Sequence, residues 1–357
     1  KKVCIVSDSN VWPLYGAAAD ASLHLAGLQT CVFVFPAGEA SKNGETFLEL
    51  LNFLAENHLS RSDILVALGG GVVGDLTGFA AACYQRGVRF VQVPTTLLAM
   101  VDSSVGGKTA IDLDAGKNLA GAFCQPELVL CDMDCLNTLR PEFFTDGCAE
   151  VLKYGVLADR ELFDHLLLRG QDFDREYVIG RCVACKRDYV CADEFDRGQR
   201  QLLNLGHTLG HAIEKNSDYQ ITHGHAVAIG MVLAAKLAHQ LGLCEEETIT
   251  RLVAALERNH LPTSTSYTAE QLTDAVVHRS SGATCEELVL LTFSDETAAK
   301  TAYHALDLYT TAQILSNKDY RPAEVSKLES AILEQRGTTV LLLVANNYEA
   351  AYALLAP

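Results

Sequence analysis

The first 135 residues alternate short apolar runs with longer segments of mixed polarity. Five runs have the length and composition of buried strands, and each ends at polar, glycine or proline residues: 3–6, 31–35, 64–68, 90–93 and 128–130. Residues 45–55 have a helical pattern between the second and third runs. Short buried strands separated by helices predict a parallel sheet in an α/β domain.

The pattern changes at about residue 141, where apolar residues begin to recur at spacings of three and four. This spacing is typical of amphipathic helices. It is clearest in residues 149–157, 177–189, 209–214, 225–243 and 245–258. Near the end of the chain, residues 338–344 have the pattern of one more strand, and a helix is expected from about residue 347. We therefore predict an α/β domain at residues 1–140 and a mostly α-helical domain at residues 141–357.

Composition agrees with two domains and excludes some partners. The chain has 357 residues, and a domain averages roughly 150. The 28 Lys and Arg against 45 Asp and Glu give a net charge of -17, which argues against nucleic acid or an anionic membrane as a partner. A small anionic substrate stays possible, because a few cations can converge locally. No apolar run reaches the roughly 18 residues of a membrane span.

The 12 cysteines are scattered through the chain, as in reduced cytoplasmic proteins, so we expect a cytoplasmic location. Cys182 and Cys185 form a lone CxxC within a predicted helix, where helix packing is favoured over a redox or zinc role. The chain begins at Lys1 without a Met, and we expect residues to be missing upstream.

Gly69, Gly70 and Gly71 follow the third predicted strand and precede a helical segment. Such a turn is either simply tight, or it lets the backbone and a helix N-terminus approach a diphosphate. Thr95 and Thr96, after the next strand, favour the second interpretation, since the ends of parallel strands gather ligands. Residues 106–109 resemble a P-loop, but its first glycine is replaced by Asp102, so an ATP-binding P-loop is set aside.

Two sets of polar residues suggest a site that binds a metal ion and an anionic group. His207 and His211 share a helix face, His223 and His225 follow, and Glu150 supplies a carboxylate in an apolar helix; imidazole and carboxylate ligands suit zinc or a similar ion. Six basic residues occur mostly in segments that contain glycine, asparagine or aromatic residues: Arg86, Lys108, Lys117, Lys153, Lys186 and Arg200. Together they suit a phosphate or carboxylate, although each one alone would be read as a surface charge.

Seven motifs in order resemble the 3-dehydroquinate synthase family: residues 69–79, 93–98, 101–109, 116–118, 149–155, 203–211 and 223–231. The resemblance extends from about residue 3 to residue 243. It implies an N-terminal Rossmann-like NAD-binding domain, a mostly α-helical metal-binding domain and a homodimer. It also implies the second step of the shikimate pathway, in which a phosphate-eliminating lyase turns 3-deoxy-D-arabino-heptulosonate 7-phosphate into 3-dehydroquinate. NAD would oxidise a ring hydroxyl transiently, and an aldol step would close the ring.

The resemblance also implies a role for each matching residue. The metal, Zn²⁺ or Co²⁺, would be held by Glu150, His207 and His223. The catalytic and substrate-binding residues would be Asp102, Lys108, Asn118, Lys153, Lys186, Arg200, Asn204 and His211, with Arg86 reaching the phosphate across the dimer. NAD would contact Asp8, Glu39, Lys42, Gly70, Gly71, Asp75, Thr95, Thr96, Lys108, Lys117 and Thr138.

The chain departs from the family pattern at three places. His225 stands where the family usually has Glu. The family's Asp-Lys-Lys is absent near residues 277–282, where either Arg279 substitutes, the segment is missing, or the substrate differs. The sequence after about residue 306 does not resemble the family. Three alternatives stay open: another sugar-phosphate cyclase, a metal-dependent polyol dehydrogenase of the glycerol dehydrogenase type, and a non-catalytic NAD-binding relative.

Overall fold

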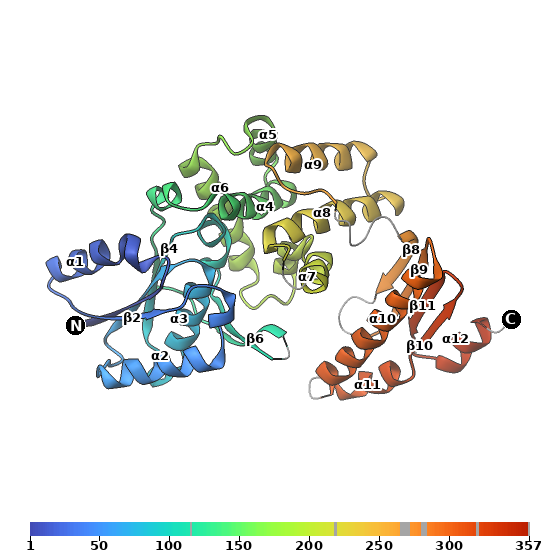
Figure 1. The fold of residues 1–357 in the computed structure, drawn as a ribbon, viewed down its shortest axis with the longest axis horizontal. Helices are drawn as coiled ribbons and strands as arrows, with labels where there is room; N and C mark the ends of the chain where they lie inside the picture. The colour runs from blue at the N-terminus through green and yellow to red at the C-terminus, as the bar shows by residue number, and fades with distance from the viewer. Residues whose placement is uncertain (115, 218–219, 265–271, 280–283, 319–320, 356–357) are drawn as a thin grey trace. The chain divides into compact units, whose positions relative to one another are not determined.

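A parallel sheet forms the centre of the first part of the chain (Figure 1). The computed structural model describes residues 1–114, 116–217, 220–264, 272–279, 284–318 and 321–355. The sheet has the order β2-β1-β3-β4-β7, with β1 (Lys2–Asp8), β2 (Gln29–Phe35), β3 (Ile64–Gly69), β4 (Arg89–Pro94) and β7 (Leu128–Val129). Every neighbouring pair is parallel, so the predicted strands and the α/β fold are confirmed.

Three helices accompany this sheet, and the second and third pack against it through apolar side chains. They are α1 (Ala17–Leu25), α2 (Gly44–Glu56) and α3 (Gly71–Cys83), with short helical turns at Trp12–Gly16, Glu39–Ser41, Tyr84–Arg86, Ala99–Ser103 and Met133–Asn137. Helix α2 begins where the Asn43 side chain accepts a hydrogen bond from the backbone of Thr46, as an N-cap does. Leu50 and Leu54 of α2 and Leu76 of α3 are fully buried in the same core as the strands.

The hairpin of β5 (Lys108–Leu113) and β6 (Gly116–Phe123) was not predicted. It packs on α3, where Gly78 is so close to the hairpin that a Cβ atom would lie 2.3 Å from the Thr109 side chain. The hairpin is glycine-rich and one of its strands is mostly exposed, so its sequence lacks the alternation that identifies a half-buried strand. It matters for function because it carries Lys108, Lys117 and Asn118.

A helical region follows the sheet. It contains α4 (Pro141–Leu157), α5 (Arg160–Arg169), α6 (Arg175–Ala192), α7 (His207–Asn216), α8 (His223–Gln240) and α9 (Glu246–Arg258), with a short helix at Gln199–Asn204. Asp159 and Asp174 cap the starts of α5 and α6 with their side chains. Tyr154, Leu162 and Leu256 are fully buried in its core. The predicted helices of this region are confirmed up to residue 258.

The expectation of one helical domain from residue 141 to the end differs from the structure, in which residues 1–263 and 264–357 form separate compact units. The second unit has an antiparallel sheet with the order β10-β11-β9-β8. Its elements are β8 (Leu272–Arg279), β9 (Glu287–Phe293), α10 (Glu296–Asn317), α11 (Pro322–Glu329), β10 (Ile332–Arg336), β11 (Thr339–Val344) and α12 (Tyr348–Leu355). An apolar run such as 288–291 suits a strand or a buried helix equally, and only its pairing with β11 decides between them.

Within the described residues, no helix is long and apolar enough to cross a membrane. All 12 cysteines are free thiols. Cys182 is buried in the helical core and Cys185 packs against it, which agrees with the packing role expected for this CxxC.

Candidate active site

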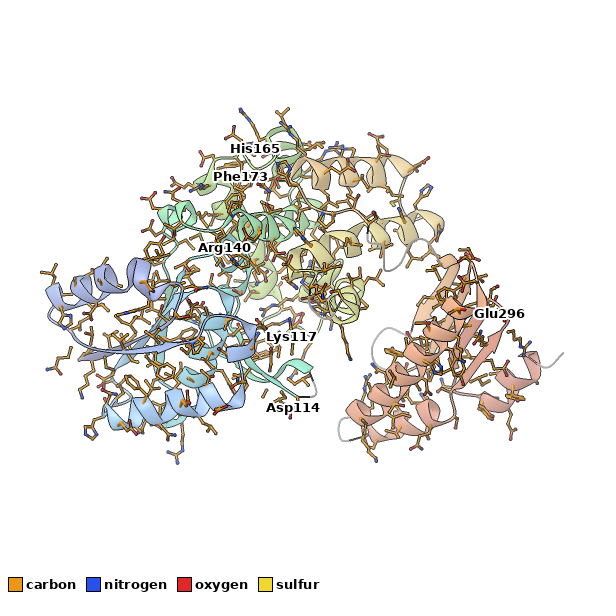
Figure 2. All side chains as sticks on the ribbon, in the orientation of Figure 1. Asp114, Lys117, Arg140, His165, Phe173 and Glu296 are labelled. Atoms are coloured by element: carbon orange, nitrogen blue, oxygen red, sulfur yellow. The ribbon has the colours of Figure 1, made fainter. Side chains whose placement is uncertain are left out.

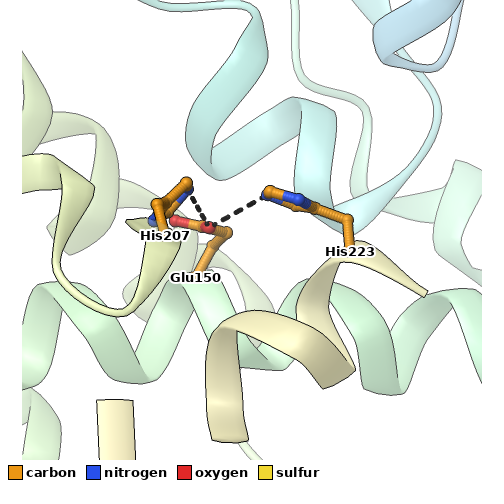
Figure 3. Close-up of side chains that lie close together, drawn as sticks. All are labelled: Glu150, His207 and His223. Carbon is orange, nitrogen blue, oxygen red and sulfur yellow. Dashed lines mark ion pairs between the residues drawn. The ribbon is translucent and has the colours of Figure 1, made fainter. Parts of the chain in front are cut away.

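Glu150, His207 and His223 lie close together, and they come from three helices of the helical region (Figure 3). The Nε2 atoms of His207 and His223 lie 3.3 Å and 3.5 Å from the same carboxylate oxygen, Oε1 of Glu150. Glu150 comes from α4, and the two histidines are the first residues of α7 and α8. The structure thus brings together the three residues that the sequence predicted as metal ligands.

Glycines let these three helices approach closely enough for the ligands to converge. A Cβ atom on Gly230 of α8 would lie 2.0 Å from the carbonyl oxygen of Gly206, next to α7. A Cβ atom on Gly224 would lie 2.0 Å from the carbonyl oxygen of Asp146 in α4. No side chain fits at either position without moving the backbone, so the small residues around the histidines determine the geometry of the site.

The Glu150 carboxylate is ionised in a fully buried position. Burial alone would raise its pKa, but the ammonium of Lys153 and the imidazoles of His207 and His223 that face the carboxylate hold this pKa well below the usual value. Lys153 lies one turn further along α4, with its Nζ against Oε2 of Glu150. Its own pKa is raised, because Glu150 and Asp102 outweigh the effect of burial.

A second buried ion pair lies beside the first. Lys186 of α6 donates to Oδ1 of Asp102 at 2.9 Å and to the backbone carbonyl of Asp102 at 2.5 Å. The hydroxyl of Tyr154 donates to the same Oδ1 at 2.5 Å. Burial would raise the pKa of Asp102, but Lys186 and Lys153 lower it to about 2. The pKa of Lys186 is lowered, chiefly by burial.

One cavity of about 600 Å³ contains most of the predicted substrate residues. Its lining includes Asp75, Asp102, Lys108, Asn118, Lys153, Lys186, Arg200, Asn204, His207, His211 and His223. Arg200 is buried, and its guanidinium donates to the carbonyl oxygens of Glu194 and Gly106. Lys108 is half exposed and forms an ion pair with Asp196. The structure therefore brings four of the six predicted cations to one cavity: Lys108, Lys153, Lys186 and Arg200.

Several of the residues predicted to contact NAD lie where the parallel strands end. Gly69 pairs with Pro94 at the ends of β3 and β4, which places the glycine turn next to Thr95 and Thr96. A Cβ atom on Gly70 would lie 3.1 Å from the Thr96 side chain, so this turn forms a narrow backbone cradle. Asp8 ends β1, and its side chain accepts from the backbone of Asn10 and Val11. Thr138 contacts the hydroxyl of Tyr15.

Lys42 is a buried hub near this edge. Its Nζ lies 2.8 Å from Glu39, 3.3 Å from Asp75 and 2.8 Å from the side-chain oxygen of Asn118. Burial raises the pKa of Asp75 to about 7, although Lys42 acts in the opposite direction. Asp112 of β5 was not predicted, yet it accepts from the Asn118 backbone at 2.8 Å. Lys42 thereby connects the segment after β2 to α3 and to the hairpin.

Some of the residues singled out in the sequence are not among those that line the cavity. Arg86 is exposed at a positive φ of 63° and is not among the residues that line the cavity. His225 is partly buried, and its backbone donates to Asp146. The backbone of Arg279 belongs to β8, but its side chain, like residues 280–283, lies outside the described part of the structure.

Glu214 of α7 is a site residue that the sequence analysis missed. Its carboxylate lies 3.3 Å from Nδ1 of His223 and 3.7 Å from Nζ of Lys117, and Figure 2 labels Lys117 on the hairpin. Glu214 stands three residues after His211 and seven after His207, so the helical period already placed it on their face. Tyr154 was missed because nothing local marks a buried tyrosine as a partner of Asp102.

Family models match most of the chain. The models described as 3-dehydroquinate synthase N-terminal and C-terminal match residues 32–146 and 147–280. A third model, described as a domain of unknown function (DUF4358), matches residues 268–345. The last match falls largely within the second compact unit and overlaps the preceding one at residues 268–280.

Solved structures of related synthases resemble the fold. A 2-epi-5-epi-valiolone synthase from Streptomyces hygroscopicus, with NAD⁺ and Zn²⁺ bound, is 30% identical with a TM-score of 0.71, covering 75% of this chain and 77% of that one. A 2-deoxy-scyllo-inosose synthase complexed with carbaglucose-6-phosphate, NAD⁺ and Co²⁺ is 28% identical, with a TM-score of 0.69 and coverage of 75% and 76%. An iron-containing alcohol dehydrogenase from Thermococcus thioreducens also shares the fold. It is 18% identical, with a TM-score of 0.54 and coverage of 73% of this chain and 80% of that one.

Curated relatives are more similar in sequence. A 3-dehydroquinate synthase from Enterococcus faecalis is 48% identical over 284 residues, which cover 78% of this chain and 79% of that protein. One from Aliivibrio fischeri is 48% identical over 269 residues, covering 73% and 74%. This identity over most of both chains shows that the chain belongs to the 3-dehydroquinate synthase family.

Proposed function

We propose that this chain converts 3-deoxy-D-arabino-heptulosonate 7-phosphate into 3-dehydroquinate and phosphate, as a phosphate-eliminating lyase of the shikimate pathway. The observation that carries the proposal is the convergence of Glu150, His207 and His223, of which the two histidines line one cavity together with Lys153 and Lys186. The 48% identity to 3-dehydroquinate synthases supports the same reaction.

The Glu150 site fits a divalent cation. Both of its carboxylate oxygens are buried and, among the described residues, lack a hydrogen bond of good geometry. Two imidazole nitrogens face one of these oxygens, and this donor set suits Zn²⁺ or Co²⁺ with positions left for a substrate. Such an ion, when bound, polarises a substrate hydroxyl and lowers its pKa. We propose Zn²⁺ as the native ion, and the related synthases solved with Zn²⁺ or Co²⁺ support this class of metal.

The edge of the sheet fits NAD, which supplies a hydride acceptor that is regenerated within the cycle. The Gly70–Gly71 turn at the start of α3 offers unpaired N–H groups to a diphosphate. Thr95 and Thr96 lie beside it, and Asp75 lines the cavity. The remaining proposed contacts are Asp8, Glu39, Lys42, Lys108, Lys117 and Thr138.

The cavity's cations would hold the two anionic groups of the substrate. Lys108, Lys153, Lys186 and Arg200 offer charge-assisted hydrogen bonds to a carboxylate and a phosphate, and Asn118 and Asn204 can bind hydroxyls. The pKa of His211 is lowered by partial loss of hydration and by His207, so its ring is neutral near pH 7. A neutral imidazole can accept the proton that leaves the carbon as phosphate departs.

We further propose a cytoplasmic homodimer in which Arg86 of one subunit reaches the phosphate at the other. The exposed position of Arg86 outside the cavity supports this role, and the free cysteines support the location. We assign NAD binding to residues 1–140 and the metal ligands to the helices after residue 140. The division between family models at residues 146 and 147 supports this boundary.

Phosphate release from the heptulosonate phosphate, with NAD present, tests the proposal. We expect turnover that a strong chelator abolishes and that added Zn²⁺ or Co²⁺ restores, with no net NADH. Turnover that is unaffected by metal removal would contradict the proposed role of Glu150. No turnover with metal and NAD supplied would reject the reaction itself.

Two other reactions are compatible with the same architecture. A cyclitol-forming cyclase would release phosphate from sedoheptulose 7-phosphate, or would cyclise glucose 6-phosphate, in preference to the heptulosonate. A polyol dehydrogenase would accumulate NADH in proportion to substrate. The higher identity to 3-dehydroquinate synthases, 48% against 30% and 28% for the cyclitol synthases, favours the proposed substrate.

A further inference from the structure

The geometry points to Glu214 as a positioning residue that orients the His223 ring for metal binding, an inference that rests on the metal site of the proposed function. The two ring nitrogens of His223 face two different carboxylates. Nε2 lies 3.5 Å from Oε1 of Glu150, and Nδ1 lies 3.3 Å from Oε2 of Glu214. The ring is therefore held between the proposed metal position and a second acid that does not belong to the ligand set.

The contact between Glu214 and His223 involves a buried carboxylate. Glu214 is only 5% exposed, although it is a charged residue. Its Oε2 faces His223, while its Oε1 lies 3.7 Å from Nζ of Lys117 on β6. A buried carboxylate needs such partners to stay ionised. As an acceptor it keeps the proton of His223 on Nδ1, which leaves the lone pair of Nε2 directed at the metal position.

The same atoms allow a different interpretation, a second cation site. Donor atoms of His211, Glu214 and His223 lie within 4.8 Å of one another. An ion there would need the lone pair of His223 on Nδ1, whereas the Glu150 site needs it on Nε2. A neutral imidazole has only one such lone pair, so the two sites exclude each other. The burial of Glu150 favours the first site, and we expect one ion per chain.

The test measures metal affinity directly, by chelator competition with Zn²⁺ or Co²⁺ on the full chain in the absence of substrate. We expect Glu214→Ala to weaken affinity about 10- to 100-fold, as loss of such an outer partner typically does. Glu214→Gln, which keeps the shape and an acceptor oxygen, should weaken it less. Glu247→Gln makes the same change of charge at an exposed position on α9 and should leave affinity unchanged.

A double-mutant cycle shows whether Glu214 acts through His223. Once His223→Ala is present, adding Glu214→Ala should have little further effect on affinity; a full additive loss would overturn the inference. Unchanged affinity in both Glu214 variants, or two ions bound per chain by elemental analysis, would also overturn it. Since affinity is read without substrate, failure of the proposed reaction in the wild-type chain is a separate result.

Discussion

Lys186 holds Asp102 through two hydrogen bonds, one to the carboxylate at 2.9 Å and one to the backbone carbonyl at 2.5 Å. Asp102 belongs to a short helix after β4 of the parallel sheet, and Lys186 belongs to α6. The pair therefore connects the α/β region to the helical region at the cavity. Its partners Tyr154 and Lys153 extend the connection to α4 and to the proposed metal site.

The first prediction concerns the pH dependence of stability. The pKa of Asp102 is lowered to about 2, so its ionised form stabilises the fold above its unfolded pKa and this stability is lost as the pH falls towards 2. Asp102→Asn should lower the free energy of unfolding by about 2 kcal/mol at pH 7. The difference should shrink below pH 4, as measured by urea midpoints between pH 3 and pH 7. Asp188→Asn on the exposed face of α6 is the control; a difference that does not change with pH would contradict the prediction.

The second prediction concerns the contact between α7 and α8. Gly230→Ala places a methyl group against the Gly206 carbonyl, and we expect a loss of about 2 kcal/mol or more. The shift should also separate His207 from His223 and weaken metal binding. Gly180→Ala in α6 is the matched control, because nothing lies within 4 Å of its Cβ position. It should stabilise by about 0.5 kcal/mol, and equal effects of the two changes on the thermal midpoint would refute the argument.

The third prediction concerns the metal. Saturating Zn²⁺ at about 100 times its dissociation constant should stabilise the native chain by about 2.7 kcal/mol. Glu150→Gln should abolish this stabilisation, because the amide removes the buried negative charge. Glu161→Gln, at a side chain that is 81% exposed, should retain it. Thermal unfolding with Zn²⁺ and with chelator measures the effect, and an undiminished response of Glu150→Gln would exclude Glu150 as a ligand.

The fourth prediction concerns NAD. Lys42→Met removes the ammonium that connects Glu39, Asp75 and Asn118. Without it the pKa of Asp75 should rise further, and the hairpin should lose the contact between Lys42 and the Asn118 side chain. We expect NAD affinity, measured by calorimetry, to fall about tenfold, equivalent to about 1.4 kcal/mol. Lys215→Met at an exposed position on α7 is the control; equal affinities for both variants would show that the hub does not shape the NAD site.

Much of the fold was predictable because its signals are local. The five parallel strands follow from short apolar runs that end in turns, and α9 follows from apolar positions such as Leu252, Ala255 and Leu256. The β5–β6 hairpin was not predicted, and of the sheet in the second unit only the strand at 338–344, which is β11, was predicted. Their strands depend on partners for pairing, as β9 depends on β11, more than 40 residues further on.

The sequence by itself determined which residues could carry the chemistry. The spacing of His207, His211 and His223, the acid at Glu150 and the lysines in small-residue segments all pointed to an anion-binding metal site before any geometry was known. The family resemblance then assigned their roles, since several long motifs occurred in order.

Only the tertiary structure decided how these groups act on one another. Glu214 and Tyr154 became visible as partners because folding buries polar groups, and a buried polar group must be satisfied by whichever element packs against it. The close approach of α4, α7 and α8 depends on glycines far apart in the chain, such as Gly206 and Gly230. Local sequence patterns specify helices and strands, whereas the contacts between them are set by packing that no single segment encodes.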